Sequence, residues 1–566
     1  MKLIKQEIGK CIKEILADEL SLDEIVGSIE LTQEEFGDLA FPCFELAKLK
    51  GQNPALIAKD LASRINPNNI ISSVEARGGF LNFYLNNDFV VQDTLESISS
   101  EEENYGSQNL GKGRLVVIDY SAPNIGKPLH VGHIRSTIIG DSLIRILRFT
   151  GYKTFGINYL GDIGLHIGKI ITAYQLWGDK ERMQQDPEKE VLDLYIEFNK
   201  RSEADSTLDE KAKQTLERLE TGDKELTDLW NYIKEMSLKA FDRVYSLLEV
   251  SFDETTGQSK FSDLGKEQVK RALELGVARK DATGAVIVDL SKLKKPLPEK
   301  VILRSDGTAI YSTQDLGAAV DRYERFNFAK MLYIVANEQQ LYFQQVFKTL
   351  ELMGYDWGKD CFHVSFGMIN LKEGRMSTRE GVIVYLEEVL NKAIDTARKI
   401  IDERNPSLAD KEQVARIVGI GAVKYMILGI DYKRDIDFSW ERALNFEGDS
   451  APYIQYGYAR ASSLLRKANL SSNDFNTSHL THPAEVFLIK KLAVFPEIVE
   501  AAAKRYSPHI IANYAAELTG AFNKFYNNVP VIDSEEIKSR LFLVNAYRVV
   551  AKRALDLLGI RVPREM

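Results

Sequence analysis

The stretch Ser121-Ala-Pro-Asn-Ile-Gly-Lys-Pro-Leu-His-Val-Gly-His-Ile-Arg-Ser136 lies where a strand is expected to turn into a helix. Before it, residues 114–120 form a short run rich in β-branched side chains, which is typical of a strand. After it, apolar residues recur at helical spacing as far as Gly151, at Ile134, Ile138, Ile139, Ile144 and Leu147. The stretch therefore predicts a strand, a turn and a helix that opens at a glycine–histidine pair.

The start of this helix is suited to binding phosphate. Free backbone N–H groups and the positive end of the helix dipole favour anions there. His130 and His133 add hydrogen-bonding groups, and Gly132 allows a nucleotide to approach the backbone. An H-x-x-H pair is also typical of a metal site or of two packed histidines. Because no Cys, Asp or Glu flanks the pair, while Lys127 and two prolines form a basic turn, the context favours phosphate.

Length and composition indicate a multidomain globular protein. The chain has 566 residues, of which 44% are hydrophobic and 27% charged, and this length predicts roughly three or four domains. Cys11, Cys43 and Cys361 lie far apart, so we expect no disulfide framework, no zinc ribbon and a reducing cytoplasm. The N-terminus is amphipathic with acidic residues, and no apolar stretch is long enough for a membrane span, so we expect neither a secretory signal nor a membrane protein.

The charge is unevenly distributed along the chain. The net charge of −9 argues against a protein that coats nucleic acid indiscriminately. Residues 451–566, however, contain 15 Lys and Arg against 10 Asp and Glu. This part is the better candidate for contact with a polyanion, although so small an excess is also typical of a solvated surface.

The pattern of apolar residues divides the chain into three regions. Residues 1–110 are expected to form an α+β module, with a helical stripe at Ile4, Ile8, Ile12 and Ile15, a helix at 54–62, a strand at 79–85 and a polar linker at 97–109. Residues 111–449 alternate strands and helices as in a doubly wound parallel sheet, with strands at 153–160, 329–336 and 363–369 and inserted helices at about 180–250. Residues 450–566 are expected to form a helical bundle.

A second candidate phosphate-binding element is the loop Gly374-Arg-Met-Ser-Thr-Arg-Glu-Gly381. Its two arginines can neutralise charge on a triphosphate and on departing pyrophosphate. Taken alone, the same letters are equally typical of an ordinary basic turn.

These motifs resemble those of a known family. The opening stretch resembles the H-I-G-H signature of class I aminoacyl-tRNA synthetases, and its longer form P-N-x-x-K-P-x-H-x-G-H-x-R-S is similar to that of arginyl-tRNA synthetases. The loop at 374–381 lies where the family has its K-M-S-K-S loop, and residues 36–40, 78–83 and 554–566 are also similar to arginyl enzymes. The resemblance implies a Rossmann-type catalytic domain with a helical insertion, an N-terminal α+β domain that binds the tRNA elbow, and an all-α anticodon-binding bundle.

The resemblance implies an arginine–tRNA ligase that uses ATP. Arginine would be activated to arginyl-adenylate and transferred to the terminal adenosine of tRNA(Arg), with Mg²⁺ and without zinc. The expected partners are L-arginine, ATP and tRNA(Arg), with no DNA and no membrane, for a cytoplasmic monomer. For catalysis and ATP binding, the resemblance nominates Lys127, His130, Gly132, His133, Arg375, Met376, Ser377 and Arg379. Arginines replace both lysines of the family loop, which makes Lys127 a candidate compensating cation.

For the substrate arginine, the resemblance nominates Ser121, Asn124, Tyr311, Asp315 and Gln339. Tyr311 and Asp315 are four residues apart and share one face if they lie on a helix. Without the resemblance, Asp315 would be interpreted as a helix cap. Two positions depart from the family pattern: Tyr342 stands where His is usual, and Gln258 where a second carboxylate is expected. Either Glu254 substitutes for that carboxylate or arginine binds less tightly.

For tRNA, the candidates are Phe80 and Asn82 near the N-terminus and Tyr453, Tyr456 and Arg460 in the bundle. Aromatic rings and guanidinium planes are typical platforms for unpaired bases. The tyrosines are equally compatible with packing inside the bundle, as are Tyr526 and Tyr547, and Phe83 is expected in the core.

Two alternatives stay open at this stage. One is another class I enzyme of the cysteinyl type, which is disfavoured because the chain lacks the cysteine–histidine set of a zinc-bound pocket. The other is a tRNA-binding relative that has lost catalysis. Gln258 and the twin arginines motivate the second alternative, and retention of His130, His133 and Asp315 argues against it.

Overall fold

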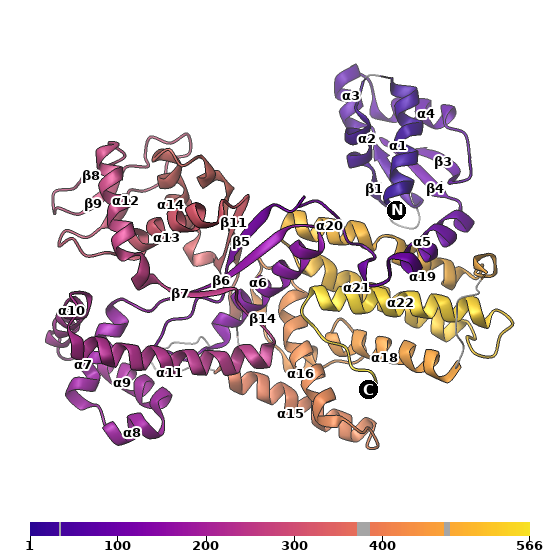
Figure 1. The fold of residues 1–566 in the computed structure, drawn as a ribbon. Helices are drawn as coiled ribbons and strands as arrows, with labels where there is room; N and C mark the ends of the chain where they lie inside the picture. The colour runs from indigo at the N-terminus through magenta and orange to yellow at the C-terminus, as the bar shows by residue number, and fades with distance from the viewer. Residues whose placement is uncertain (18, 33–35, 371–384, 469–475) are drawn as a thin grey trace.

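A five-stranded parallel sheet occupies the middle of the molecule (Figure 1). The structure is a computed structural model that describes residues 1–566 except 18, 33–35, 371–384 and 469–475. Its strand order is β12-β11-β5-β6-β7, and every pairing is parallel. The strands are β5 (Leu115–Asp119), β6 (Lys153–Leu160), β7 (Glu254–Gly257), β11 (Lys330–Ala336) and β12 (Cys361–Phe366). Helix α6 (Val131–Phe149) follows β5. The chain leaves β5 on one side for β6 and returns on the other at β11, so the carboxyl end of β5 is the expected place for a ligand.

The helical insertion lies between β6 and β7 and is longer than predicted. Helices follow the sequence expectation from residue 180 to about 250, and a further helix precedes them. They are α7 (Leu165–Trp177), α8 (Lys180–Gln185), α9 (Pro187–Ser202), α10 (Thr207–Glu220) and α11 (Lys224–Leu248), at the lower left of Figure 1.

A second excursion, between β7 and β11, contains a small antiparallel sheet of order β10-β9-β8 that the sequence did not predict. Its strands have only three or four residues, which is too short for a visible alternation of apolar and polar side chains. The elements are η3 (Gln258–Phe261), α12 (Ser262–Glu274), β8 (Ala278–Lys280), β9 (Val286–Val288), β10 (Lys300–Leu303) and α13 (Tyr311–Phe326). After β11 come η4 (Asn337–Gln339), α14 (Gln340–Leu352), η5 (Asp356–Asp360) and the parallel pair β13 (Ile369–Asn370) and β14 (Ile436–Asp437).

The N-terminal region forms an antiparallel sheet of order β1-β2-β4-β3 covered by helices, in agreement with the predicted α+β module. Ile4, Ile8 and Ile12 are fully buried, and so is Phe83. The elements are α1 (Lys2–Leu16), α2 (Leu22–Ser28), β1 (Glu30–Leu31), β2 (Leu39–Pro42), α3 (Phe44–Lys50), α4 (Pro54–Arg64), β3 (Ile71–Arg77) and β4 (Phe80–Leu85).

The expected linker at residues 97–109 is wrong over its first half. Helix α5 (Asn87–Glu101) and the short helix η2 (Glu102–Asn104) occupy it, because Ile98 continues an apolar stripe that the serines and glutamates obscure. Just beyond, Tyr105 donates its hydroxyl to the Leu492 carbonyl at 3.1 Å and stacks on Phe495 at 6.2 Å. The segment therefore fastens the N-terminal region to the C-terminal helices.

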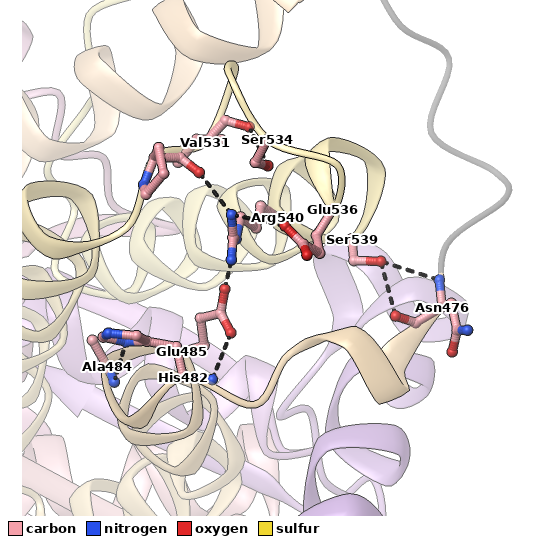
Figure 2. Close-up of polar contacts among 10 residues, drawn as sticks. Asn476, His482, Ala484, Glu485, Val531, Ser534, Glu536, Ser539 and Arg540 are labelled. Carbon is pink, nitrogen blue, oxygen red and sulfur yellow. Dashed lines mark hydrogen bonds and ion pairs between the residues drawn. The ribbon is translucent and has the colours of Figure 1, made fainter.

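The C-terminal part is helical, as predicted. Its elements, with the helices that lead into it, are α15 (Leu386–Arg404), α16 (Lys411–Leu428), α17 (Trp440–Ala443), α18 (Ala451–Ala468), η6 (Thr477–His479), α19 (Pro483–Ala493), α20 (Phe495–Arg505), α21 (His509–Asn528) and α22 (Ile537–Leu557). A buried ion pair between Glu485 and Arg540, at 2.8 Å, joins the start of α19 to α22 (Figure 2). One hydrophobic cluster runs from Val91 through α6 to Ile560, so the domain limits at 110 and 449 stay predictions.

Side chains from several helices bind the last ten residues of the chain through backbone carbonyls. Ser142 of α6 donates to the Leu557 carbonyl at 2.9 Å, and Lys424 of α16 donates to that of Gly559 at 2.6 Å. Gln455 of α18 donates to the Arg561 carbonyl at 2.7 Å. The bundle is thus tied to the helix that follows β5. No helix in the described part of the chain is long and apolar enough to cross a membrane.

A buried ion pair attaches α13 to the central sheet. Arg322 Nη2 lies 2.9 Å from Asp119 Oδ2, with side-chain exposures of 2% and 5%. We expect Asp119→Asn to lower the free energy of unfolding by about 3–5 kcal/mol, because it leaves the buried Arg322 guanidinium without its ion-pair partner. Urea unfolding measures the loss. Asp360→Asn is the control: it breaks the more exposed Lys330–Asp360 pair and should cost less than about 1 kcal/mol. Equal losses would contradict the prediction.

Candidate active site

The turn between β5 and α6 carries an unusual backbone. Ser121 and Ala122 have φ of 72° and 51°, in the left-handed region that non-glycine residues rarely adopt. The Ser121 amide donates to Ser136 Oγ at 2.9 Å, and the Ser121 hydroxyl lies 2.8 Å from that of Tyr245. Ser121 is 4% exposed and accepts a further bond from Thr137, so its hydroxyl supports the turn rather than facing open space.

Asn124 lies at the carboxyl end of β6. It forms a parallel bridge with Gly161, whose amide donates to the Pro123 carbonyl at 3.0 Å. A Cβ on Gly161 would come within 1.9 Å of Asn124 Oδ1. A glycine is therefore needed for the Asn124 side chain to lie over the strand end.

The two histidines of the opening stretch form the N-terminal cap of α6. His130 Nδ1 accepts from the Gly132 amide at 3.0 Å, and His133 Nδ1 accepts from the His130 amide at 3.2 Å. Since both Nδ1 atoms accept, both neutral rings carry their proton on Nε2. The ring centroids are 4.0 Å apart, so two Nε2–H donors lie side by side at the positive end of a 19-residue helix.

The surroundings keep these rings neutral. Burial and the Lys127 ammonium lower the pKa of His130 to about 4. Burial and the neighbouring His130 lower the pKa of His133 well below its ordinary value. Burial and Lys127 also lower the pKa of His166 to about 4. The site thus presents neutral imidazole donors at neutral pH.

Arg135, to which the sequence analysis gave no role, is almost fully buried. Its guanidinium donates to the carbonyls of Gly367 at 2.6 Å, Arg434 at 2.8 Å and Tyr432 at 3.0 Å. Burial lowers its pKa to about 10, although Asp435 and Asp431 oppose the shift. In the sequence, only its position within the motif could have indicated this role for Arg135, because its partners lie about 230 to 300 residues away.

The predicted residues Arg375, Met376, Ser377 and Arg379 lie outside the described residues. The chain on each side of them is anchored beside the histidines. Arg135 holds the Gly367 carbonyl on one side, and on the other the Leu386 amide donates to the Leu129 carbonyl at 3.0 Å.

Tyr311 and Asp315, which the family resemblance nominated, both lie on α13, and Asp315 is half-buried. Asp315 accepts a short hydrogen bond from the Tyr342 hydroxyl and has no ion pair among the described residues. Burial raises its pKa, against the hydrogen bond from Tyr342 and the charge of Arg322. Asp315 does not cap α13, since Ile310 occupies the N-cap position. Tyr311 is 52% exposed at the first turn.

Gln258 follows β7 directly, at the same edge of the sheet as Asn124. Its Oε1 is buried and has no hydrogen-bond partner among the described residues. Asp162, which the sequence analysis missed, holds this turn: it accepts from the Ser259 amide at 2.9 Å and from Lys234 at 2.7 Å. Gln339 ends η4 after β11 and is exposed.

Glu254 does not substitute for the missing carboxylate. It begins β7 and so lies at the opposite end of the strand from Gln258. It is also paired with Arg325 at 2.6 Å and Lys260 at 3.7 Å. That part of the expectation is wrong.

The candidate base-stacking residues separate into exposed and buried ones. The Arg460 guanidinium lies between the Tyr456 and Tyr526 rings, at 4.8 and 4.7 Å from their centroids, and these rings are 41% and 36% exposed. Arg460 also donates to Asn523 at 2.7 Å, and Asn523 donates to the Tyr453 hydroxyl at 3.1 Å.

Other aromatic candidates belong to packed layers. Tyr547 is fully buried, with its ring 3.9 Å from that of Phe522. At the N-terminus, Phe80 packs edge-on against the exposed Phe44, whereas Asn82 is only 4% exposed.

Three family models match the chain. The catalytic domain of class I (R) tRNA synthetases matches residues 94–440, the DALR anticodon binding domain matches 454–566, and the arginyl tRNA synthetase N-terminal domain matches 2–85.

Whole-chain comparisons agree with these models. The chain is 42% identical to the arginine–tRNA ligase of Halothermothrix orenii, over 100% of this chain and 98% of that protein. It is 41% identical to the enzyme of Clostridioides difficile, over the full length of both. The structure is similar to that of Thermus thermophilus arginyl-tRNA synthetase, with a TM-score of 0.85, 26% identity, and coverage of 100% of this chain and 99% of that chain.

The neutral state of His130 predicts an acid sensitivity. Unfolded histidine takes up a proton near pH 6.5, whereas folded His130 does so only near pH 4, so stability is lost as pH falls through this window. We expect His130→Asn, which keeps a capping side chain, to lose about 1 kcal/mol less stability than wild type between pH 7 and pH 5.5. Urea unfolding at the two values measures this difference. The exposed His479→Asn is the control, and an unchanged acid loss in His130→Asn would contradict the prediction.

Proposed function

The chain belongs to the arginyl-tRNA synthetase family, and from this premise we propose which residues perform its reaction. The protein is an arginine–tRNA ligase whose substrates are arginine, ATP and tRNA(Arg). The cysteinyl-type alternative and the catalytically impaired relative are not favoured by any comparison.

Activation needs positioning and charge stabilisation rather than a protein nucleophile. The carboxylate of arginine attacks the α-phosphorus of ATP, the bond to the bridging oxygen breaks, and pyrophosphate leaves. The Nε2–H groups of His130 and His133 donate to phosphate oxygens as negative charge shifts, while Gly132 admits the nucleotide to the helix start. Support for this role comes from the two Nδ1 atoms, which both accept backbone N–H groups. Each neutral imidazole therefore keeps its proton on Nε2 and can donate it without being charged.

Lys127 and the loop at 374–381 act on the departing pyrophosphate in this proposal. Arg375 and Arg379 neutralise its charge, and Met376 and Ser377 contact ATP. Mg²⁺ would accompany ATP and would be held by the phosphate oxygens, because imidazoles and an ammonium are not the oxygen ligands that it prefers.

The substrate guanidinium is recognised by Asp315. Support comes from the half-buried Asp315 carboxylate, which accepts from the Tyr342 hydroxyl and has no ion-pair partner among the described residues, so it is available to a cationic side chain. Tyr311 covers the side chain, and Gln258 accepts one guanidinium N–H through its unpartnered Oε1. Asn124 and Gln339 line the rest of the pocket, with Ser121 supporting the turn.

The 2′-hydroxyl oxygen of the terminal adenosine then attacks the carbonyl carbon of arginyl-adenylate, the acyl–phosphate bond breaks, and AMP and a proton are released. We propose that Tyr453, Tyr456 and Arg460 receive anticodon bases, because Arg460 is already held between two exposed rings. Phe80 and Asn82 are assigned to the tRNA elbow. The protein is proposed to work in the cytoplasm as a monomer, without zinc, DNA or a membrane.

We expect Asp315→Asn to raise the KM for arginine at least tenfold, because it removes a charge-assisted hydrogen bond. The KM for ATP should change less than twofold. Pyrophosphate exchange with tRNA present measures both constants. Asp321→Asn, on the same helix but paired with Arg325, is the matched control. Equal effects on the two substrates would show that the arginine pocket lies elsewhere, and no arginine-dependent exchange by wild type would overturn the function.

Introducing a carboxylate at position 258 should strengthen arginine binding. We expect Gln258→Glu to lower the KM for arginine about five- to tenfold, because a charged acceptor replaces a neutral one. The same exchange assay checks this. Gln214→Glu adds the same charge on the exposed side of α10 and should have no effect. If both variants leave the KM unchanged, Gln258 does not contact the guanidinium.

A further inference from the structure

Lys127 of the catalytic turn is held by a residue of the helical insertion. Its ammonium donates to the Tyr195 hydroxyl at 3.2 Å and lies 4.4 Å from the centroid of the Tyr195 ring. Tyr195 belongs to α9, and the Lys127 ammonium has no other hydrogen bond or ion pair among the described residues. One side chain of the insertion therefore fixes the position of this cation.

Tyr195 is buried, and neighbouring residues of the insertion support its part of α9. It is 5% exposed, and Asn199 donates to its carbonyl at 2.8 Å. Lys169 of α7 holds Asn199 at 3.1 Å and pairs with Asp209 of α10 at 2.9 Å. These contacts join α7, α9 and α10 around the helical turn that carries Tyr195.

The turn that carries Lys127 is also packed on the insertion. The Gly126 amide donates to Ser237 of α11 at 2.9 Å. Gly126 has φ of 71°, and a Cβ there would come within 2.5 Å of Ile170 of α7. The insertion therefore positions both the backbone of this turn and the Lys127 ammonium. The central sheet provides neither of these contacts.

The Lys127 charge lowers the pKa values of groups in the insertion and in the histidine cluster. Although burial opposes the shift, Lys127 and the hydrogen bond from it lower the pKa of Tyr195. The same ammonium lowers the pKa values of His130 and His166, after burial. Lys127 has no carboxylate within ion-pair distance among the described residues, so its charge is left to act on an anion.

We infer that Tyr195 is a positioning residue for the activation step, holding the Lys127 ammonium where the departing pyrophosphate develops charge. The inference rests on the proposed role of Lys127. The hydroxyl fixes the direction of the ammonium, and the ring face stabilises it without a neutralising carboxylate, so the full positive charge remains available. A carboxylate at this position would hold Lys127 equally well but would cancel its charge.

A double-mutant cycle tests the inference in the full-length protein. We expect Tyr195→Phe, which keeps the ring, to lower kcat for arginine-dependent pyrophosphate exchange about fivefold, and Tyr195→Leu to lower it further. The KM for arginine should stay within twofold. In a Lys127→Met background, Tyr195→Phe should have no additional effect, because the group it positions is absent.

Controls separate positioning from folding. Tyr232→Phe removes a comparable hydroxyl on α11, which donates to the Met183 carbonyl at 3.1 Å, and should leave kcat unchanged. A multiplicative loss in the Tyr195/Lys127 double variant, or equal losses in Tyr195→Phe and Tyr232→Phe, would overturn the inference. If Lys127→Met itself keeps full exchange activity, the proposed role of Lys127 fails instead. A loss in Lys127→Met with none in Tyr195→Phe would overturn only the positioning role.

Discussion

The buried guanidinium of Arg135 is the constraint on which the proposed nucleotide site depends. A charge removed from water must be compensated, and here three backbone carbonyls between Gly367 and Arg434 provide most of that compensation. Those carbonyls belong to segments that follow β12 and precede β14, so α6 cannot move independently of them. The histidine cap at one end of α6, the strand end and the approach to the loop at 374–381 are consequently fixed as one unit.

The electrostatics of the site follow a common logic: cations and donors are held by neutral partners. Lys127 rests on a phenol, Arg135 on carbonyls, and His130 on a backbone amide. None of these partners carries a full opposite charge, so positive potential is retained where phosphate is proposed to bind. The proposed arginine pocket has the opposite charge but the same kind of partner, since the Asp315 carboxylate accepts from the neutral Tyr342 hydroxyl.

Local patterns predicted the fold wherever the signal lies within one element. β5 and α6 were predicted closely, because their apolar spacing is continuous. β7 was missed because Glu-Thr-Thr-Gly has no apolar run, and pairing with β6 makes it a strand. The site divides in the same way. The helix start at the histidines was predicted from local spacing, and Asp315 was nominated by the family resemblance. Asp162 and Tyr195 instead act through partners 97 and 68 residues away, which no local pattern records. Ser121 shows the converse, since its nominated hydroxyl is bound by Tyr245, 124 residues on.

The contact between Ser142 of α6 and the Leu557 carbonyl has a consequence for how the protein is made. These residues are 415 positions apart, so at ordinary rates of translation the helix that caps the nucleotide site lacks this partner for about 20–80 s after it leaves the ribosome. Tyr105 likewise waits for Leu492, 387 residues later. The part of α6 that contacts α22 therefore lacks this partner until the final helix has been synthesised, whereas its contacts with β5, β6 and β11 can form earlier.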